Sequence, residues 1–299
     1  MPRVSICIPT YNHAKFVGRA LDTALEQSEA DLEVVVLDDG STDGTFEIAS
    51  SYRDPRLRVE GGQRHLGHGE NFNRSLDAAK GTYIKILCDD DFLYPGAISR
   101  LADGLDRFPD ATFATSAWDL LDDVASVKRT RRLLEHAPDD GTLVDLRQIV
   151  VSSRLWRNRI GSPSSVLLRK TALTGLRFNP QYRQMMDWDL WLQLLKRGPL
   201  VYFPQVLSAY QWHSETLTAK QVPLAQTATD LLTISTVLAD SLPDFRAAIS
   251  SWDVKRLQGL CCLNALQVAA LNGWHRRWGL AVQNLRLAVR ALLMFLRIG

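Results

Sequence analysis

The sequence of 299 residues lacks the features that mark several common protein classes. Its four cysteines have no spacing that fits a zinc site or a disulfide framework. We interpret them as reduced structural thiols of a cytoplasmic protein, because Cys7 and Cys88 lie in apolar runs that are typical of buried strands. The formal net charge is only +2, which is too small to suggest nucleic acid as a partner.

Long apolar runs are also missing. The chain has no run of 18 uncharged apolar residues, so we expect no transmembrane helix. Its first three residues lead directly into an expected strand, and we therefore expect no signal peptide. Internal repeats and low-complexity segments are absent too. With 46% hydrophobic and 23% charged residues, the chain suits a globular protein with one large domain or two smaller ones.

What is present is a regular alternation of short apolar runs with segments of helical spacing. Strands are expected at 4–9, 32–37, 57–59 and 83–88. Helices are expected at 16–27, 70–79 and 95–108, with another that ends at Ser51 and is capped by Ser41, Thr42 or Asp43. Gly81 is the expected C-cap of the helix at 70–79. This order predicts an α/β fold, in which helices cover both faces of a mostly parallel sheet.

The pattern is looser from about Ala111 onward. Strands are expected at 112–116, 166–168 and 201–203, and a helix at 186–195. The charged segment 122–140 is expected to be a surface excursion. After Thr218 the chain is expected to be mainly helical, at about 224–238, 254–271 and 278–296.

Polar clusters follow three of the expected strands, where ligands bind in parallel sheets. They are Thr10-Tyr11-Asn12, Asp38-Asp39 and Asp89-Asp90-Asp91. Adjacent carboxylates repel one another, and a divalent cation such as Mg²⁺ or Mn²⁺ would relieve that repulsion and also hold substrate phosphates. A solvated turn that caps the next helix is the alternative interpretation of the triplet. Asp38 and Asp39 could bind a second metal or a nucleotide base on which Tyr11 stacks, or they could be helix-capping acids.

Taken together, these motifs resemble the family 2 glycosyltransferases, which have the GT-A fold. The resemblance covers about residues 3–215 and rests on motifs in the right order: Pro9-Thr10-Tyr11-Asn12, Asp38-Asp39-Gly40-Ser41-Thr42-Asp43, Asn71-Phe72-Asn73-Arg74, Ala79-Lys80-Gly81-Thr82-Tyr83-Ile84, and Asp89-Asp90-Asp91 with Pro95 after it. It implies a nucleotide-sugar donor and a Mn²⁺ or Mg²⁺ cofactor.

The resemblance also implies roles for single residues. Pro9, Thr10 and Tyr11 would line the base pocket, Asp39 would bind the base, and Asp38 would support the loop. The expected donor site also takes in Asn12, Asn71, Arg74, Asp89 and Asp90. Asp90 would be the chief metal ligand, assisted by Asp89 or Asp91, while His213 could bind the metal or the diphosphate. Relatives often have a further acid where this chain has Cys88.

The catalytic base implied by the resemblance is Asp187, with Asp189 as the second candidate. A single carboxylate would take the proton from the acceptor hydroxyl while the metal stabilises the leaving diphosphate, which gives inversion at the sugar. Relatives often have glutamate where this chain has Met186. Without the resemblance, Asp187 and Asp189 would be interpreted as acids at a helix N-terminus.

The final expected helix has Gln283, Arg286, Arg290 and Arg297 on one stripe, with apolar residues over most of the remaining surface. It could pack against the domain or another subunit, or lie on an anionic membrane. Peripheral contact at the inner face of a membrane would suit a lipid-linked acceptor.

The sequence therefore predicts an inverting transferase that moves a sugar from a UDP-sugar, as the default donor, to a glycan or lipid-linked acceptor in surface polysaccharide or glycan biosynthesis. The predicted division is a donor half at 1–105, an acceptor and catalytic half at 106–218, and a helical region at 219–299. The alternative is a non-catalytic nucleotide-sugar-binding or scaffold protein. A nucleotidyltransferase is disfavoured because residues 10–13 do not resemble a glycine-rich phosphate loop.

Overall fold

The computed structural model describes residues 1–29, 31–62, 64–153, 158–182, 184–213 and 216. The described residues form two compact units. The first comprises Met1–Asp145, Arg159–Pro180 and Leu190–Trp212. The second contains the described parts of Leu146–Asn158 and Gln181–Asp189, with His213 and Thr216. The predicted division at residues 105 and 218 stays a prediction, and the helices expected after Thr218 lie outside the described residues.

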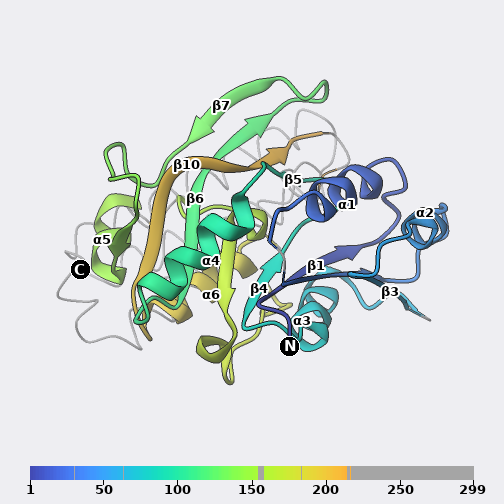
Figure 1. The fold of residues 1–299 in the computed structure, drawn as a ribbon, viewed down its shortest axis with the longest axis horizontal. Helices are drawn as coiled ribbons and strands as arrows, with labels where there is room; N and C mark the ends of the chain where they lie inside the picture. Colours follow the sequence, from blue (N-terminus) through green and yellow to red (C-terminus); the bar gives the residue numbers. More distant parts are fainter. Residues whose placement is uncertain (30, 63, 154–157, 183, 214–215, 217–299) are drawn as a thin grey trace, which may run out of the picture. The chain divides into compact units, whose positions relative to one another are not determined.

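One sheet organises the first unit. Among the described residues it has ten strands, with the path β3-β2-β1-β4-β9-β6-β10-β5, while β7 pairs with β6 and β8 with β10 (Figure 1). Their bounds are β1 Val4–Thr10, β2 Leu32–Asp38, β3 Leu57–Gly61, β4 Tyr83–Ile86, β5 Phe92–Leu93, β6 Phe113–Leu121, β7 Val127–Arg131, β8 Thr142–Val144, β9 Val166–Arg169 and β10 Leu200–Gln211. The strands β3, β2, β1 and β4 are parallel, and β6 and β10 are parallel to each other. The strand β9 is antiparallel to both of its neighbours, and β5, β7 and β8 also form antiparallel pairs. The central sheet is thus mostly parallel as predicted, with antiparallel strands added in its second half.

Helices of the first unit cover both faces of this sheet. The described helices are α1 Val17–Leu25, α2 Thr45–Ser51, α3 His68–Ala78, α4 Ala97–Arg107, α5 Leu146–Ser153 and α6 Met186–Leu195, with short 3-10 turns η1 Pro163–Ser165 and η2 Lys170–Leu173. Ile6 and Ile8 of β1 point into a core that also contains α1 and α4. Between them, Cys7 points to the other face, where its thiol contacts the Ser75 carbonyl of α3. Side chains alternate along a strand, so this buried strand requires apolar residues at consecutive positions.

Gly81 is not the C-cap that the sequence predicts. The helix α3 ends at Ala78, and Ala79 follows in an extended conformation with its N–H bonded to the Ser75 carbonyl. Gly81 is needed for space instead, because a Cβ atom there would lie 2.7 Å from the backbone nitrogen of Ser5. Its own N–H donates to the Ser5 hydroxyl at 2.7 Å.

The second half of the sheet is more extended than predicted. The strand expected at 201–203 lies near the start of the twelve-residue β10, which pairs with β6 through two register shifts. The charged segment 122–140 includes β7, which forms an antiparallel pair with β6. The sequence does not predict this strand, because edge strands often carry polar residues and so lack the apolar alternation that marks a strand. Among the described residues, no helix is long and apolar enough to span a membrane.

Candidate active site

The ends of three parallel strands meet at one edge of the sheet, as predicted. Thr10 of β1 is in register with Asp38 of β2, and β4 runs along the other side of β1. The Asp39 N–H donates to the Thr10 carbonyl at 2.9 Å, so the pairing continues one residue beyond β2. The chain after β4 turns into Asp89, Asp90 and Asp91, which brings the acidic triplet to the same edge.

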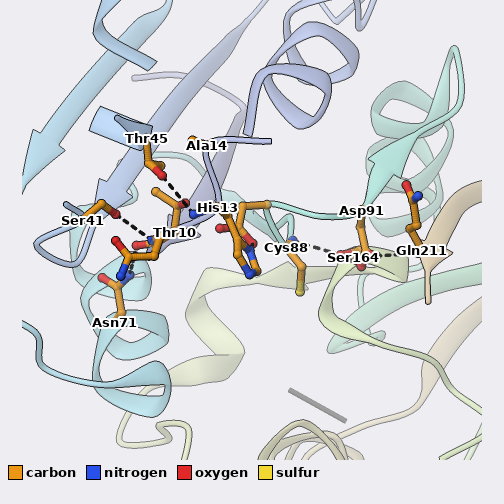
Figure 2. A network of polar contacts seen from close by, with 12 residues as sticks. Thr10, His13, Ala14, Ser41, Thr45, Asn71, Cys88, Asp91, Ser164 and Gln211 are labelled. Carbon is orange, nitrogen blue, oxygen red and sulfur yellow. Dashed lines mark hydrogen bonds and ion pairs between the residues drawn. The ribbon is translucent and has the colours of Figure 1, made fainter. Parts of the chain in front are cut away.

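The loop after β1 is held firmly by the loop after β2 (Figure 2). Asn12 donates its N–H to the Ser41 hydroxyl at 2.9 Å and accepts the Thr42 N–H at 2.8 Å through its side chain. His13 donates its N–H to the Thr45 hydroxyl at 2.9 Å. Asn12 has a φ of 52°, a left-handed conformation that asparagine tolerates better than most residues. The loop is therefore fixed by specific contacts.

In the first carboxylate pair, three of the four oxygens accept backbone N–H groups, while Asp38 Oδ1 has no hydrogen-bond partner among the described residues. One oxygen of Asp38 accepts from Gly40 and Ser41, both at 3.0 Å. The two oxygens of Asp39 accept the N–H groups of Leu66 and Gly67, each at 2.9 Å. Both side chains are almost completely buried. These charges are compensated by amide dipoles, which is how buried carboxylates are usually accommodated.

Two aromatic rings lie close to the Asp38 and Asp39 pair. Tyr11 stacks on His65 with ring centroids 3.8 Å apart and an interplanar angle of 24°. The Nδ1 atom of His65 lies 2.9 Å from Asp39. The Tyr11 side chain is 39% exposed and the ring is therefore accessible to a ligand.

Asn71 and Arg74 of α3 bind the backbone behind the same loop. The Asn71 amide donates to the Leu37 carbonyl at 2.9 Å. The Arg74 guanidinium donates to the carbonyls of Asp38 at 3.0 Å and Glu60 at 3.3 Å. Arg74 therefore supports the ends of β2 and β3, a role that the sequence does not reveal.

The acidic triplet has a different environment. The Nδ1 atom of His13 lies 2.8 Å from an Asp89 oxygen. The buried Asp91 accepts the Ser164 hydroxyl at 2.6 Å and the Gln211 N–H at 3.1 Å, so both of its oxygens are engaged (Figure 2). Burial raises the pKa of Asp89, and burial together with the Asp90 charge raises the pKa of Asp91 well above the usual range. Neighbouring negative charges are thus poorly compensated here.

This crowded triplet provides donor atoms for a cation. Two groups in the described part of the chain have their potential ligand atoms within 4.8 Å of one another: His13 with Asp89 and Asp90, and Cys88 with Asp90 and Asp91. Asp90 belongs to both groups. Carboxylate oxygens suit Mg²⁺ and Mn²⁺, and imidazole adds a ligand that is common for transition metals. The residues therefore fit a divalent cation.

The sequence profile of Glycosyl transferase family 2 matches residues 5–177. The chain belongs to this family. Chondroitin synthase from Escherichia coli is 28% identical over 229 residues, which are 75% of this chain and 31% of that protein. This family 2 glycosyltransferase therefore spans about a third of the length of that relative.

Solved structures with the same architecture confirm the GT-A fold of this family 2 chain. TarS from S. aureus, residues 1–349 in complex with UDP-GlcNAc, has a TM-score of 0.63 and 16% identity, with coverage of 98% of this chain and 92% of that one. The mannosyltransferase PcManGT from Pyrobaculum calidifontis, in complex with GDP-Man and Mn²⁺, has a TM-score of 0.58 and 18% identity, with coverage of 99% and 87%.

The remaining predicted residues of this glycosyltransferase lie in the second compact unit. Asp187 is partly buried and accepts the side-chain amide of Asn158 at 2.9 Å. Burial raises the pKa of Asp187 to about 7. Asp189 and His213 are buried as well, and the His213 carbonyl accepts the Thr216 N–H at 3.1 Å. The roles of all three residues remain predictions.

Three residues of the family 2 site were missed by sequence reasoning. His13 follows the Thr10-Tyr11-Asn12 cluster directly, and that adjacency was the available signal. Ser164 lies 73 residues from Asp91 and no local pattern connects them. Lys85 is fully buried within β4 and its Nζ atom has no hydrogen-bond partner among the described residues. Burial lowers the pKa of Lys85 to about 7, against the attraction of Asp91.

Proposed function

We propose that this family 2 glycosyltransferase moves a sugar from a nucleotide diphosphate, with UDP as the default, to an acceptor hydroxyl with inversion at the sugar carbon. The observation that carries this proposal is the placement of a crowded acidic triplet beside a compensated carboxylate pair at one edge of the sheet. The names of chondroitin synthase and of the UDP-GlcNAc complex of TarS support a role in polysaccharide or glycan biosynthesis. The acceptor is a glycan or a lipid-linked sugar.

The base of the donor would be bound at the ends of β1 and β2. Pro9 and Thr10 are buried and shape the floor, while the exposed Tyr11 ring offers a surface for stacking. Asp38 holds the loop through Gly40 and Ser41. Asp39 would accept a base N–H, since each carboxylate oxygen can accept more than one hydrogen bond. Asn12, Asn71 and Arg74 would keep these loops in place.

The diphosphate would be bound at the acidic triplet through Mn²⁺ or Mg²⁺. When bound, such a cation neutralises phosphate charge and stabilises the leaving diphosphate. Asp90 and Asp89 would provide carboxylate ligands, since the oxygens of Asp91 already bind Ser164 and Gln211. Asp91 would then position the turn, and His213 is a further candidate for the metal or the diphosphate. Mn²⁺ in the PcManGT complex supports a metal at sites of this fold.

The catalytic base would be Asp187. A general base works best with a pKa near the working pH, and burial raises the pKa of this carboxyl to about 7. The Asn158 amide donates to one oxygen and so fixes the orientation of the carboxylate. A single base with direct attack gives inversion.

The test of this assignment is Asp187→Asn, with Asp189→Asn as the matched control. We expect Asp187→Asn to keep nucleotide-sugar affinity and to lose transfer by about a thousandfold, within the range that general-base catalysis provides. Wild-type kcat should fall as the pH drops below about 7, because protonation removes the base. A larger loss in Asp189→Asn than in Asp187→Asn would transfer the role to Asp189.

A non-catalytic nucleotide-sugar-binding or scaffold protein is the second candidate, and the thiol of Cys88 next to the acidic triplet is the observation that favours it. Slow hydrolysis of a UDP-sugar in the presence of Mn²⁺ distinguishes the two candidates. Hydrolysis that is lost in Asp90→Ala supports the enzyme, and binding without any turnover supports the scaffold. The expected cytoplasmic location, with peripheral membrane or subunit contact through the C-terminal helices, stays a prediction.

A further inference from the structure

His13 lies between the two halves of the donor site. Its backbone belongs to the loop after β1, which contacts the loop after β2, while its ring faces the acidic triplet. The ring is 20% exposed and the Asp89 side chain is 9% exposed. Contacts with the loop after β2 therefore hold the backbone of His13, while its imidazole faces the acidic triplet.

The positioning of His13 does not depend on its ring. The His13 N–H is bound by Thr45, the neighbouring Ala14 N–H by the Asp43 carboxylate at 3.0 Å, and the His13 carbonyl accepts the N–H groups of Phe16 and Val17 at the start of α1. The backbone is thus anchored on three sides. A rigid backbone allows the ring to serve a ligand, as preorganised metal sites require.

We propose that His13 is a direct ligand of the divalent cation, together with Asp89 and Asp90. The proposal rests on the metal dependence of the proposed function and adds a nitrogen ligand to it. The ligand atoms of these three residues all lie within 4.8 Å of one another. The Nδ1 atom of His13 and the carboxylates of Asp89 and Asp90 would then hold the cation together.

The geometry of the pair suits an octahedral ion. Ligand atoms at about 2.1 Å from a common centre and at right angles to one another lie about 3 Å apart. The Nδ1 atom of His13 and the Asp89 oxygen lie 2.8 Å apart. The cation would therefore enter with only a small movement of the two side chains. Metal binding through Nδ1 would require the neutral imidazole with its hydrogen on Nε2.

A second observation points to the same place. Thr10 is 2% exposed, and among the described residues its hydroxyl oxygen has no hydrogen-bond partner of good geometry. The same hydroxyl lies beside Asp89. A buried hydroxyl is costly without a partner, and a water molecule on the bound cation would provide one.

The other group of donor atoms is less suitable. Both oxygens of Asp91 already accept hydrogen bonds, from Ser164 and Gln211, and metal binding would compete with both contacts. Mg²⁺ and Mn²⁺ prefer oxygen and imidazole ligands to the soft sulfur of the Cys88 thiol. The structure thus favours His13 over Cys88 as the third ligand.

The experiment uses the full-length protein and Mn²⁺ alone. Pulsed EPR detects a nitrogen nucleus bound to Mn²⁺, and titration of the free Mn²⁺ signal gives the dissociation constant. We expect nitrogen coupling in the wild type and in His136→Ala, a control with an exposed histidine. We expect no such coupling in His13→Ala or His13→Gln, with an affinity that is weaker by about tenfold or more.

His68 is an alternative nitrogen ligand, because Asp90 and His13 are its charged neighbours. Variants of His68 can therefore overturn the proposal. Coupling that persists in His13→Gln and disappears in His68→Gln or His213→Gln would assign the nitrogen to another ligand. Wild-type protein that binds Mn²⁺ without nitrogen coupling would also refute the proposal, while metal-dependent sugar transfer by that protein would leave the proposed function intact. Thermal melting of each variant excludes unfolding as the cause.

Discussion

Two groups of aspartates follow neighbouring strands of the same sheet, and their surroundings differ. Asp38 and Asp39 follow β2, and four backbone N–H groups donate to their oxygens. Asp89, Asp90 and Asp91 follow β4, where burial and then neighbouring negative charge raise the pKa values of Asp89 and Asp91. Three of the four oxygens of the first group accept backbone N–H groups, and only Asp38 Oδ1 has no hydrogen-bond partner among the described residues. The second group has fewer such donors, so added positive charge would stabilise it. Acidic residues at strand ends can thus stabilise a loop or bind a cation, and the number of nearby N–H donors distinguishes the two roles.

The largest test of this comparison is Asp90→Ala. We expect it to reduce sugar transfer by about a thousandfold, since removal of a group that stabilises transition-state charge costs several kcal/mol. Asp123→Ala, which changes an exposed acid on the hairpin between β6 and β7, is the control and should keep the wild-type rate. Transfer rates at saturating Mn²⁺ give the answer, and a rate within tenfold of the wild type would contradict the role of the triplet.

The complementary change is Asp38→Ala. It leaves the N–H groups of Gly40 and Ser41 without their acceptor, and each unsatisfied buried donor costs about 1–3 kcal/mol. We expect the free energy of unfolding to fall by about 3 kcal/mol, measured by urea denaturation with and without Mn²⁺. The loss should be the same in both conditions. A loss that Mn²⁺ restores would show that the first pair also binds the metal.

These two groups also show what the sequence could predict. The order of strands and helices predicts the sheet, and the parallel arrangement predicts that polar clusters after β1, β2 and β4 share an edge. The compensation of Asp39 could not be predicted, because its partners are backbone N–H groups 27 and 28 residues further along the chain. The contact of His13 with Asp89 spans 76 residues and depends on the pairing of β1 with β4.

The sequence-based predictions were wrong at Gly81, where close packing determines the residue, and at β7, which is an edge strand. Gly81 satisfies the composition rule for a helix C-cap, yet it is required by the close approach of Ser5. β7 has exposed and partly exposed residues throughout, so no apolar alternation marks it. Side-chain burial, which raises the pKa of Asp187 to about 7, depends on the packing of distant segments.

Addition of Mn²⁺ should stabilise the wild type through the acidic triplet alone. A ligand at a concentration of about 100 times its dissociation constant adds roughly 2.7 kcal/mol to the free energy of unfolding. We expect a corresponding rise in Tm for the wild type and for Asp38→Ala, and none for Asp90→Ala. Differential scanning calorimetry in Mn²⁺ and in EDTA measures the shift. An equal rise in all three proteins would indicate binding elsewhere.

The smallest expected effect concerns Lys85, a basic side chain of β4 near the acidic triplet. Lys85 is fully buried, and its desolvation outweighs the attraction of Asp91. We expect Lys85→Met to raise the free energy of unfolding by about 2 kcal/mol, because it removes a buried charge without a hydrogen-bond partner.

The direction of the Lys85 pKa shift determines how the effect of Lys85→Met depends on pH. The folded-state pKa of Lys85 is about 7 and its ordinary value is 10.5, so the unfolded chain binds the additional proton between these values. Wild-type stability therefore rises with pH across that window. The advantage of Lys85→Met should be largest below pH 7 and should shrink as the pH approaches 10.5, as urea denaturation at several pH values can show. A destabilised variant would mean that Lys85 and Asp91 form a necessary ion pair.

The contact of Asp39 with residues 66 and 67 has a consequence for protein engineering. This carboxylate binds the main-chain N–H groups of residues 66 and 67, so these two contacts do not require particular side chains there. Gly67, with a φ of +96°, must be kept, and so must His65, whose ring contacts Asp39 and stacks on Tyr11. The side chains of Arg64 and Leu66 are exposed beside the proposed base site. A library randomised at these two positions would therefore vary the surface of that site while the contacts of Asp39 are preserved, and we expect it to alter the nucleotide preference.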